Sequence, residues 1–133
     1  MSPHAIYVSG LEHGTNPIPA AARRGPLLMT GAVRGVDRAA GALPQDAAEE
    51  VRLAFDNLRA VLEAGGGTLD DVVHINVFLG ADGIRPLVNE SWVTAYPEEA
   101  VRPARHVIRQ DLPAGMKVQL EATAYIAESG GTA

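Results

Sequence analysis

Two charged side chains near the C-terminal end of the chain have the types and spacing to bind and transform a small carboxylate. Arg105 lies in the segment Arg102-Pro-Ala-Arg-His-Val-Ile-Arg109, and Glu121 lies in the segment Lys117–Ile126. A guanidinium group can hold a carboxylate through two parallel hydrogen bonds. A carboxylate nearby can move protons to and from a bound water. The pair could therefore hold an anionic substrate and activate water beside it.

The segments that carry Arg105 and Glu121 have the pattern of two strands joined by a turn. Apolar and polar residues alternate along 117–126, as in a half-buried strand, and Leu112-Pro-Ala-Gly115 is a turn signal. With the turn centred near Pro113, Arg105 and Glu121 are each eight residues away, which predicts a hairpin with these two as cross-strand partners. Surface ion pairs on sheets have the same spacing and little energetic value, so the spacing alone does not establish a site.

Short motifs in a fixed order carry a resemblance to a known family. The chain contains Thr30-Gly31, Asn57-Leu58, Leu62-Glu-Ala-Gly65, Asp71-Val-Val73, Val88-Asn89-Glu90, Pro103-Ala-Arg105, Leu112-Pro113 and Val118-Gln-Leu-Glu-Ala-Thr-Ala124. In this order they resemble the RidA family, also called YjgF/UK114, whose C-terminal signature is a P-A-R motif, an L-P turn and a V-x-I-E-A-x-A strand. The resemblance extends from about Asn16 to Ile126, nearly the whole chain.

The resemblance implies a chorismate-mutase-like (bacillar) α+β fold, assembled as a homotrimer with clefts between subunits. Proteins of the RidA type hydrolyse reactive enamines and imines, such as 2-aminoacrylate and 2-imino acids, to a 2-keto acid and ammonia. The implied site needs a clamp for the substrate carboxylate, a held water and a proton shuttle, but neither a metal ion nor another cofactor. Closed three-fold rings have head-to-tail interfaces, so each cleft would contain residues of two chains.

The resemblance also assigns roles to individual residues. Arg105 matches the family's substrate-carboxylate arginine, and Glu121 matches the glutamate that activates water or protonates the leaving nitrogen. Gly31 and the backbone around Val107 match positions that supply main-chain hydrogen bonds, and Asn89 matches a position near the cleft. Asn89 could equally be a polar residue on a helix face. A nearby cation would favour an ionised Glu121 acting as a base, whereas burial would favour a protonated acid, so both roles stay open.

At four positions the chain departs from the family pattern. Ile18 stands in place of the tyrosine that lines the family cleft, and Thr30 stands where serine is usual. Ala32 stands where glutamine is usual, and His106 follows Arg105 where serine is frequent. With Thr30 and Ile18 among the expected substrate-binding residues, a cleft with Ile18 and His106 would be more apolar on one wall and titratable on the other, so we expect a different pocket for the substrate's side chain. A larger, pathway-specific imine is the expected substrate.

Composition limits the partners and the chemistry. The net charge is −5, with 11 basic residues, and these are not clustered, which argues against nucleic acid as a partner and against RNA cleavage, an activity linked to the family's older name. Cysteine is absent, so disulfides and thiolate catalysis are excluded. The N-terminal segment has no signal-peptide pattern, and no apolar run is long enough to span a bilayer. We expect a cytoplasmic protein that does not bind membranes.

The pattern predicts one domain over residues 1–133, with loose tails at 1–4 and 128–133. The expected order is β-β-β-α-β-α-β-β, a mixed sheet with both helices packed on one face. Before the terminal hairpin, the expected strands are 5–9, 25–34 and 70–79, and the expected helices are 46–64 and 84–95.

Apolar spacing predicts which faces of these elements are buried. In the first helix, three- and four-residue steps form one stripe of Val51, Ala54, Phe55, Leu58, Val61 and Leu62. In strand 70–79, one face is expected to carry Val73, Ile75, Val77 and Leu79. Gly65-Gly-Gly67 follows a helix rather than opening one, and no lysine follows it, so it predicts a helix C-cap rather than a phosphate loop.

The remaining candidate groups favour ordinary structural roles. The four histidines lack the spacing of metal ligands, and in a regular strand His106 would point away from Arg105. Trp92 and Phe78 are predicted to belong to the core. A second class of function also remains: an inactive trimeric module that binds a ligand or a protein partner in the same cleft. Such a module would not need both Arg105 and Glu121, so their joint presence favours the deaminase.

Overall fold

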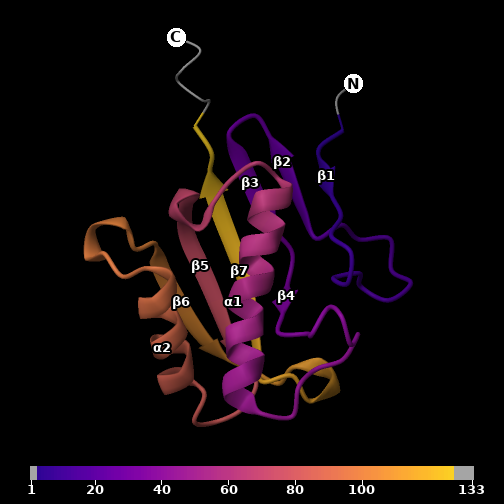
Figure 1. Ribbon diagram of the computed structural model, residues 1–133, viewed down its shortest axis with the longest axis vertical. Coiled ribbons are helices and arrows are strands. Elements are labelled where there is room, and N and C mark those ends of the chain that lie inside the picture. Colours follow the sequence, from indigo (N-terminus) through magenta and orange to yellow (C-terminus); the bar gives the residue numbers. More distant parts are fainter. Residues whose placement is uncertain (1–2, 128–133) are drawn as a thin grey trace.

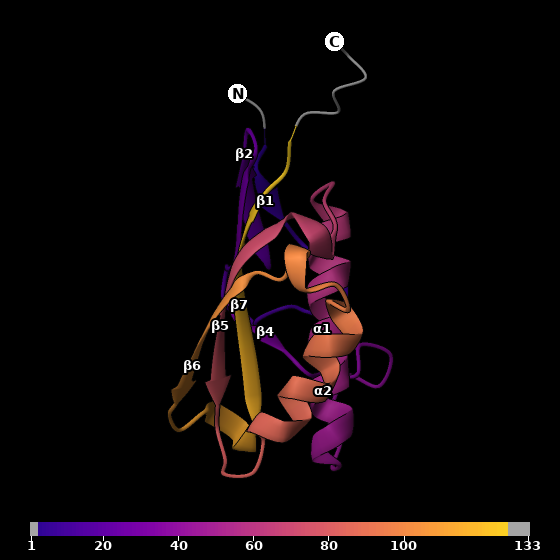
Figure 2. The same cartoon turned by 90° about the vertical axis from the view of Figure 1, so that its left-hand side faces the viewer.

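A mixed sheet of seven strands forms the centre of the fold, and both helices pack on one of its faces (Figure 1, Figure 2). The computed structural model describes residues 3–127. Its strands are β1 (Ala5–Ile6), β2 (Ala21–Arg24), β3 (Leu27–Thr30), β4 (Val33–Arg34), β5 (Val72–Leu79), β6 (Ala104–Arg109) and β7 (Val118–Tyr125). The helices are α1 (Ala47–Ala64) and α2 (Arg85–Ala95). The prediction of two helices on one face of a mixed sheet is confirmed.

The two ends of the chain are only partly within the described range. The tail predicted at 128–133, and residues 1–2 of the tail predicted at 1–4, lie outside the described residues. At the N-terminal end the carbonyl of His4 accepts a hydrogen bond of 2.8 Å from the backbone N–H of Arg23. Within residues 3–127, no helix combines the length and the apolar character that a membrane crossing requires.

The N-terminal third contains four strands, whereas the predicted order has three before the first helix, of which only 5–9 and 25–34 could be placed. The expected strand 5–9 is reduced to β1, and a strand that was not predicted, β2, pairs with β3 around a turn at Gly25 and Pro26. Gly25 has φ 57°, a conformation that costs glycine little and other residues much. The expected strand 25–34 is divided into β3 and β4, which pair separately with β7.

The predicted hairpin of the last two strands is wrong. The sheet order is β1-β2-β3-β7-β5-β6, so β5 lies between β7 and β6. β6 pairs in parallel with β5, while β7 pairs with the other edge of β5 in antiparallel orientation. The cause lies in the crossover: α2 carries the chain from β5 back to the start of a parallel strand, a connection that needs a dozen or more residues. β7 then takes the edge of β5 that remains open.

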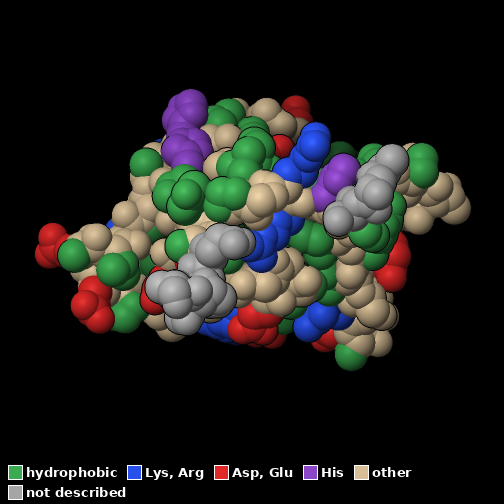
Figure 3. All heavy atoms as spheres, turned by 90° about the horizontal axis from the view of Figure 1, so that it is seen from above, with side chains coloured by type: hydrophobic (Ala, Val, Ile, Leu, Met, Phe, Trp, Pro, Cys, Tyr) green, Lys and Arg blue, Asp and Glu red, His purple; other side chains and the backbone are tan. Residues whose placement is uncertain are grey.

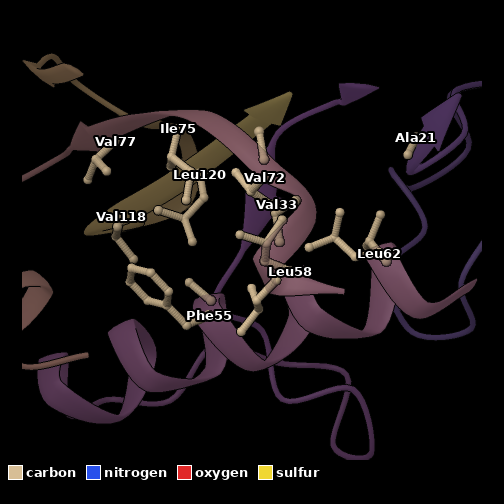
Figure 4. Packing of buried hydrophobic residues seen from close by; sticks show 14 of the residues in the cluster. Ala21, Val33, Phe55, Leu58, Leu62, Val72, Ile75, Val77, Val118 and Leu120 are labelled. Carbon is tan, nitrogen blue, oxygen red and sulfur yellow. The ribbon is translucent and has the colours of Figure 1, made fainter. Parts of the chain in front are cut away.

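α1 covers the sheet with the apolar stripe that its spacing predicted. Asp46 accepts a hydrogen bond from the N–H of Glu49 at the N-terminus, and Gly66, with φ 86°, provides the left-handed residue after the C-terminus. The six predicted stripe residues are buried. Figure 4 shows Phe55, Leu58 and Leu62 pointing toward the side chains of the sheet. Both termini of the helix and its buried face therefore follow the sequence signals.

One polar residue on the buried face of α1 was not anticipated. Asn57 is 3% exposed, and its Nδ2 donates hydrogen bonds of 2.8 Å to the carbonyl oxygens of Arg34 and Val36. These two bonds hold the chain just after β4 against the helix. The asparagine therefore supplies donors to backbone acceptors that lie away from water.

β5 shows one error in the predicted burial pattern. Val73 is 53% exposed, while Val72, Ile75, Val77 and Leu79 are buried against the helices. The pairing of β5 with β7 shifts register between Val72 and His74, as at a β-bulge. The bulge shifts the alternation at the start of the strand, so that Val72, expected on the opposite face, is buried and Val73 is exposed.

Replacing Asn57 by alanine should destabilise the fold, because the carbonyls of Arg34 and Val36 would lose their donors in a buried setting. We expect the free energy of unfolding to fall by about 3 kcal/mol. Urea denaturation at one fixed protein concentration would measure it. Glu63→Ala, at an exposed position of the same helix, is the control. A loss for Asn57→Ala as small as that of Glu63→Ala would contradict this role.

Candidate active site

Arg105 and Glu121 lie on opposite faces of the sheet. Arg105 on β6 is the register partner of Ile75 on β5, whereas Glu121 on β7 is the partner of the next residue, Asn76. Consecutive residues of a strand point to opposite faces, and Ile75 is fully buried beneath the helices. Arg105 therefore points to the helix side and Glu121 to the uncovered side. The predicted cross-strand pairing of these two residues is wrong.

The side chain of Arg105 lies over the indole ring of Trp92, which is on α2. Its guanidinium carbon is 5.0 Å from the ring centroid, the geometry of a cation–π contact. Trp92 is half-buried and packs against the core, and its ring also lies 5.2 Å from that of Tyr96. The phenol of Tyr96 is held by a buried hydrogen bond to the carbonyl of Leu69. The indole ring beneath Arg105 is therefore supported by Tyr96, which is itself held by its hydrogen bond to Leu69.

Three further residues lie beside this pair. Asn89 and Arg85 precede Trp92 by three and seven residues on α2, so helical periodicity places all three on one face. Val107 follows Arg105 by two residues on β6, is directed to the same face of the sheet and packs against the core. We refer to Arg85, Asn89, Trp92, Arg105 and Val107 as the arginine half-site.

The charge of Arg105 has no acidic counterpart. Within residues 3–127, no carboxylate lies within ion-pair distance of Arg105. Burial lowers the pKa of Arg105, and the positive charge of Arg85 lowers it further. Both effects mean that the protonated guanidinium is poorly compensated by its surroundings. An anion that bound here would supply the missing partner.

A second group of predicted site residues lies on the other side of β5. Thr30 accepts a hydrogen bond of 3.0 Å from the N–H of Ala122 and donates one of 2.7 Å to the carbonyl of Gly31. Glu121, half-buried, is the neighbour of Ala122 on β7. We refer to Glu121, Thr30, Gly31 and Ile18 as the glutamate half-site.

The loop before β2 is connected to the glutamate half-site through Gly31. The N–H of Gly31 donates to the carbonyl of Ala20 over 2.9 Å, which ties this loop to the end of β3. Ile18, two residues earlier, is 48% exposed. Because the N–H of Gly31 is already used within the chain, its carbonyl, which has a second lone pair, is the main-chain group left for a ligand.

His106 points away from Arg105, as predicted for a regular strand. It is the partner of Asn76 on β5, and Asn76 is in turn the partner of Glu121. The three residues therefore form one row across the uncovered face of the sheet. Figure 3 shows histidine side chains beside hydrophobic ones on the surface of the molecule. His106 thus shares a face with Glu121, not with the arginine half-site.

The sequence analysis assigned Trp92 to the core, and its ring does pack against the core, but its contact with Arg105 was not anticipated. The signal that could have identified this contact is the position of Trp92 shortly after the motif Val88-Asn89-Glu90, three residues beyond Asn89 and thus on the same helix face. Among residues 3–127, no three His, Asp or Glu side chains are grouped closely enough to hold a metal ion.

Comparison with known proteins places this geometry in a family. A sequence model described as endoribonuclease L-PSP matches residues 15–126. The chain is 30% identical over 127 residues to the 2-iminobutanoate/2-iminopropanoate deaminase of Escherichia coli strain K12, covering 92% of this chain and 91% of that protein. A putative endoribonuclease from Thermotoga maritima has a similar structure, with a TM-score of 0.86, 26% identity, and coverage of 96% of this chain and 100% of that chain. RidA from the Antarctic bacterium Psychrobacter sp. PAMC 21119 gives a TM-score of 0.83 with 28% identity, covering 92% of this chain and 98% of that chain.

Trp92 is the single tryptophan of the chain, so its emission should report binding at Arg105. A small carboxylate such as 2-oxobutanoate should change the fluorescence saturably, because it would bind the cation that covers the ring. Arg105→Ala should weaken this binding by at least about tenfold. Arg38→Ala, at an exposed arginine in the turn before α1, should leave it unchanged. Equal titration curves for the wild type and Arg105→Ala would contradict a carboxylate site at Arg105.

Proposed function

The chain belongs to the endoribonuclease L-PSP family, which includes RidA and YjgF, and from this we propose that it hydrolyses reactive imines and enamines. The substrates would be of the 2-aminoacrylate and 2-imino acid type, and the products a 2-oxo acid and ammonia. The relative at 30% identity is named for the deamination of two such imines. The observation that carries the proposal is the half-buried guanidinium of Arg105, stacked on Trp92 and without an acidic partner among residues 3–127.

In this proposal Arg105 binds the substrate carboxylate. Two parallel hydrogen bonds from a planar guanidinium would fix both the position and the orientation of the carboxylate. The cation–π contact with Trp92 restricts where the guanidinium can lie, so less conformational freedom is lost when the substrate binds. Asn89 and the backbone of Val107 lie beside this position and would bind further polar atoms of the substrate.

Glu121 would handle the proton transfers of the reaction. Water adds to the carbon of the C=N bond, a proton reaches the nitrogen, and the resulting carbinolamine loses ammonia to leave the C=O bond of the 2-oxo acid. A carboxylate can accept a proton from the attacking water and return it to the leaving nitrogen. Both the base and the acid role are used within one cycle, which is how a single carboxylate could serve the whole reaction.

A complete site of this kind requires two chains. Within one chain, β5 separates β6 from β7, so Arg105 and Glu121 are about 10 Å apart across the sheet as well as on opposite faces. One small imine cannot contact both. A neighbouring copy can bring its glutamate half-site to the arginine half-site of the first, and repeating this head-to-tail contact closes a ring. We include the homotrimer in the proposal on this ground.

The uncovered face of the sheet has the character of an interface between copies. Leu27, Met29 and Tyr125 lie on it and are 47%, 53% and 58% exposed. Val73 at the bulge adds a fourth large apolar side chain, 53% exposed. Neighbouring exposed apolar residues of this kind are typical of surfaces that are covered by another chain. Covering this face with a second copy of the chain would remove apolar surface from water and so favour the assembly that the split site requires.

The substrate's side chain would meet a pocket that differs from the usual family cleft. Ile18 offers an apolar surface without a hydroxyl group, and the hydroxyl of Thr30 is used by Ala122 and Gly31 within the chain. This supports a larger, pathway-specific imine. An inactive binding module with the same cleft is the alternative, and the presence of both a carboxylate clamp and a proton carrier favours the enzyme.

Hydrolysis of imines by the purified protein tests the proposal. An amino-acid oxidase generates 2-iminobutanoate in situ, and semicarbazide traps the fraction that escapes hydrolysis. We expect the wild type to suppress trapping, and Arg105→Ala to lower kcat/KM by about 100-fold because two charge-assisted bonds are lost. Glu121→Gln should lower kcat by about 100-fold or more.

Arg38→Ala is the control and should retain full activity. If the wild type fails to suppress trapping of both small and large imines, the deaminase proposal is wrong and the binding module replaces it. Full activity of Glu121→Gln would show that Glu121 is not the group that carries protons in the reaction.

A further inference from the structure

A second unpaired arginine lies in the arginine half-site. Arg85 is exposed, belongs to the first turn of α2 and, among residues 3–127, has no carboxylate within ion-pair distance. It is close enough to Arg105 for its charge to lower the pKa of that residue. Two like charges that are held near each other repel unless an anion lies between them. The assignment of Arg105 to a substrate carboxylate leaves Arg85 without a role.

Arg109, on the same strand as Arg105, shows that the fold can place acidic side chains beside an arginine in this region. Arg109 is directed to the same face of β6 as Arg105, and its guanidinium lies 3.4 Å from Asp82 and 3.9 Å from Asp111. The chain has 16 acidic residues and a net charge of −5. Arg85 and Arg105 nevertheless lack acidic partners within the described part of the chain, while their neighbour has two. Among residues 3–127, Arg23, Arg24, Arg34, Arg38 and Arg102 also lack acidic partners, so what distinguishes Arg85 and Arg105 is that they lie near each other beside Trp92.

The surface between the two arginines suits a short hydrocarbon chain. Trp92 lies under Arg105, and Val107 faces the same side of the sheet one step farther along β6. α2 runs antiparallel to β6, because it connects the end of β5 to the start of the parallel strand β6. Passing from Arg105 to Val107 therefore leads toward the first turn of α2, where Arg85 lies. A molecule with one anionic group at each end and methylene groups between them matches this order.

We propose that the preferred substrate is a 2-imino dicarboxylate, with its α-carboxylate on Arg105, its methylene groups over Trp92 and Val107, and its distal carboxylate on Arg85. This rests on the proposed imine hydrolysis and names the substrate class of that site. It also makes Arg85 a specificity-determining residue. The distal carboxylate contributes to binding but takes no part in the addition of water to the C=N bond.

The test compares two imines of similar length that differ in the distal charge. Amino-acid oxidases acting on glutamate and norleucine generate 2-iminoglutarate and 2-iminohexanoate, and semicarbazide trapping gives kcat/KM for each. We expect the wild type to prefer 2-iminoglutarate by about tenfold, the value of one charge-assisted hydrogen bond. Arg85→Gln should abolish this preference by lowering kcat/KM for 2-iminoglutarate alone. Arg38→Gln, which removes the same charge elsewhere on the surface, should retain the preference.

The outcomes separate this inference from the function on which it rests. Hydrolysis of both imines without a preference for 2-iminoglutarate would overturn the dicarboxylate inference and leave the deaminase intact. A preference that survives in Arg85→Gln would overturn the assignment of the distal carboxylate to Arg85. If the protein hydrolyses none of the three imines (2-iminoglutarate, 2-iminohexanoate and 2-iminobutanoate), both the dicarboxylate inference and the proposed deaminase function are wrong. A fall in kcat/KM for 2-iminoglutarate in Arg85→Gln that exceeds any change for 2-iminohexanoate by about tenfold would support the inference.

Discussion

The position of β5 between β6 and β7 is the constraint on which the rest of the site depends. Because β5 and β6 are joined by a crossover helix, they are parallel neighbours, and β7 must pair with the other edge of β5. This order places Arg105 and Glu121 two strands apart and on opposite faces. The sheet thus presents a cation on its helix side and a carboxylate on its uncovered side. Chemistry that needs both groups on one small molecule can occur only between copies of the chain.

Each half-site is held in place by contacts within its own chain. Trp92, itself packed on Tyr96, supports the guanidinium of Arg105, and the hydroxyl of Thr30 joins the end of β3 to the backbone beside Glu121. Supports of this kind fix reacting groups before the substrate arrives, which lowers the entropic cost of binding. What each half-site lacks is its complement: the arginine has no anion, and the glutamate has no cation within ion-pair distance among the described residues.

Sequence patterns predicted local features well and strand neighbours poorly. The stripe of α1 and the alternation of β7 were correct because helical and strand periodicities are set by the backbone and read from adjacent residues. The hairpin of β6 and β7 was wrong because turn residues between two strands do not exclude a third strand from inserting between them. Two contacts were not predicted because each joins distant parts of the chain. Asn57 on α1 bonds to backbone carbonyls at and after the end of β4. Trp92 on α2 contacts the guanidinium of Arg105 on β6.

Complementation between two inactive variants tests the two-chain site most directly. Arg105→Ala keeps the glutamate half-site, and Glu121→Gln keeps the arginine half-site, so mixed rings contain some interfaces with both groups intact. Co-expression in equal amounts should restore activity to about one quarter of the sites, the fraction expected for random head-to-tail pairing. Activity no higher than that of the separate variants would contradict a site shared between chains. It would mean that Arg105 and Glu121 do not act on the same substrate molecule.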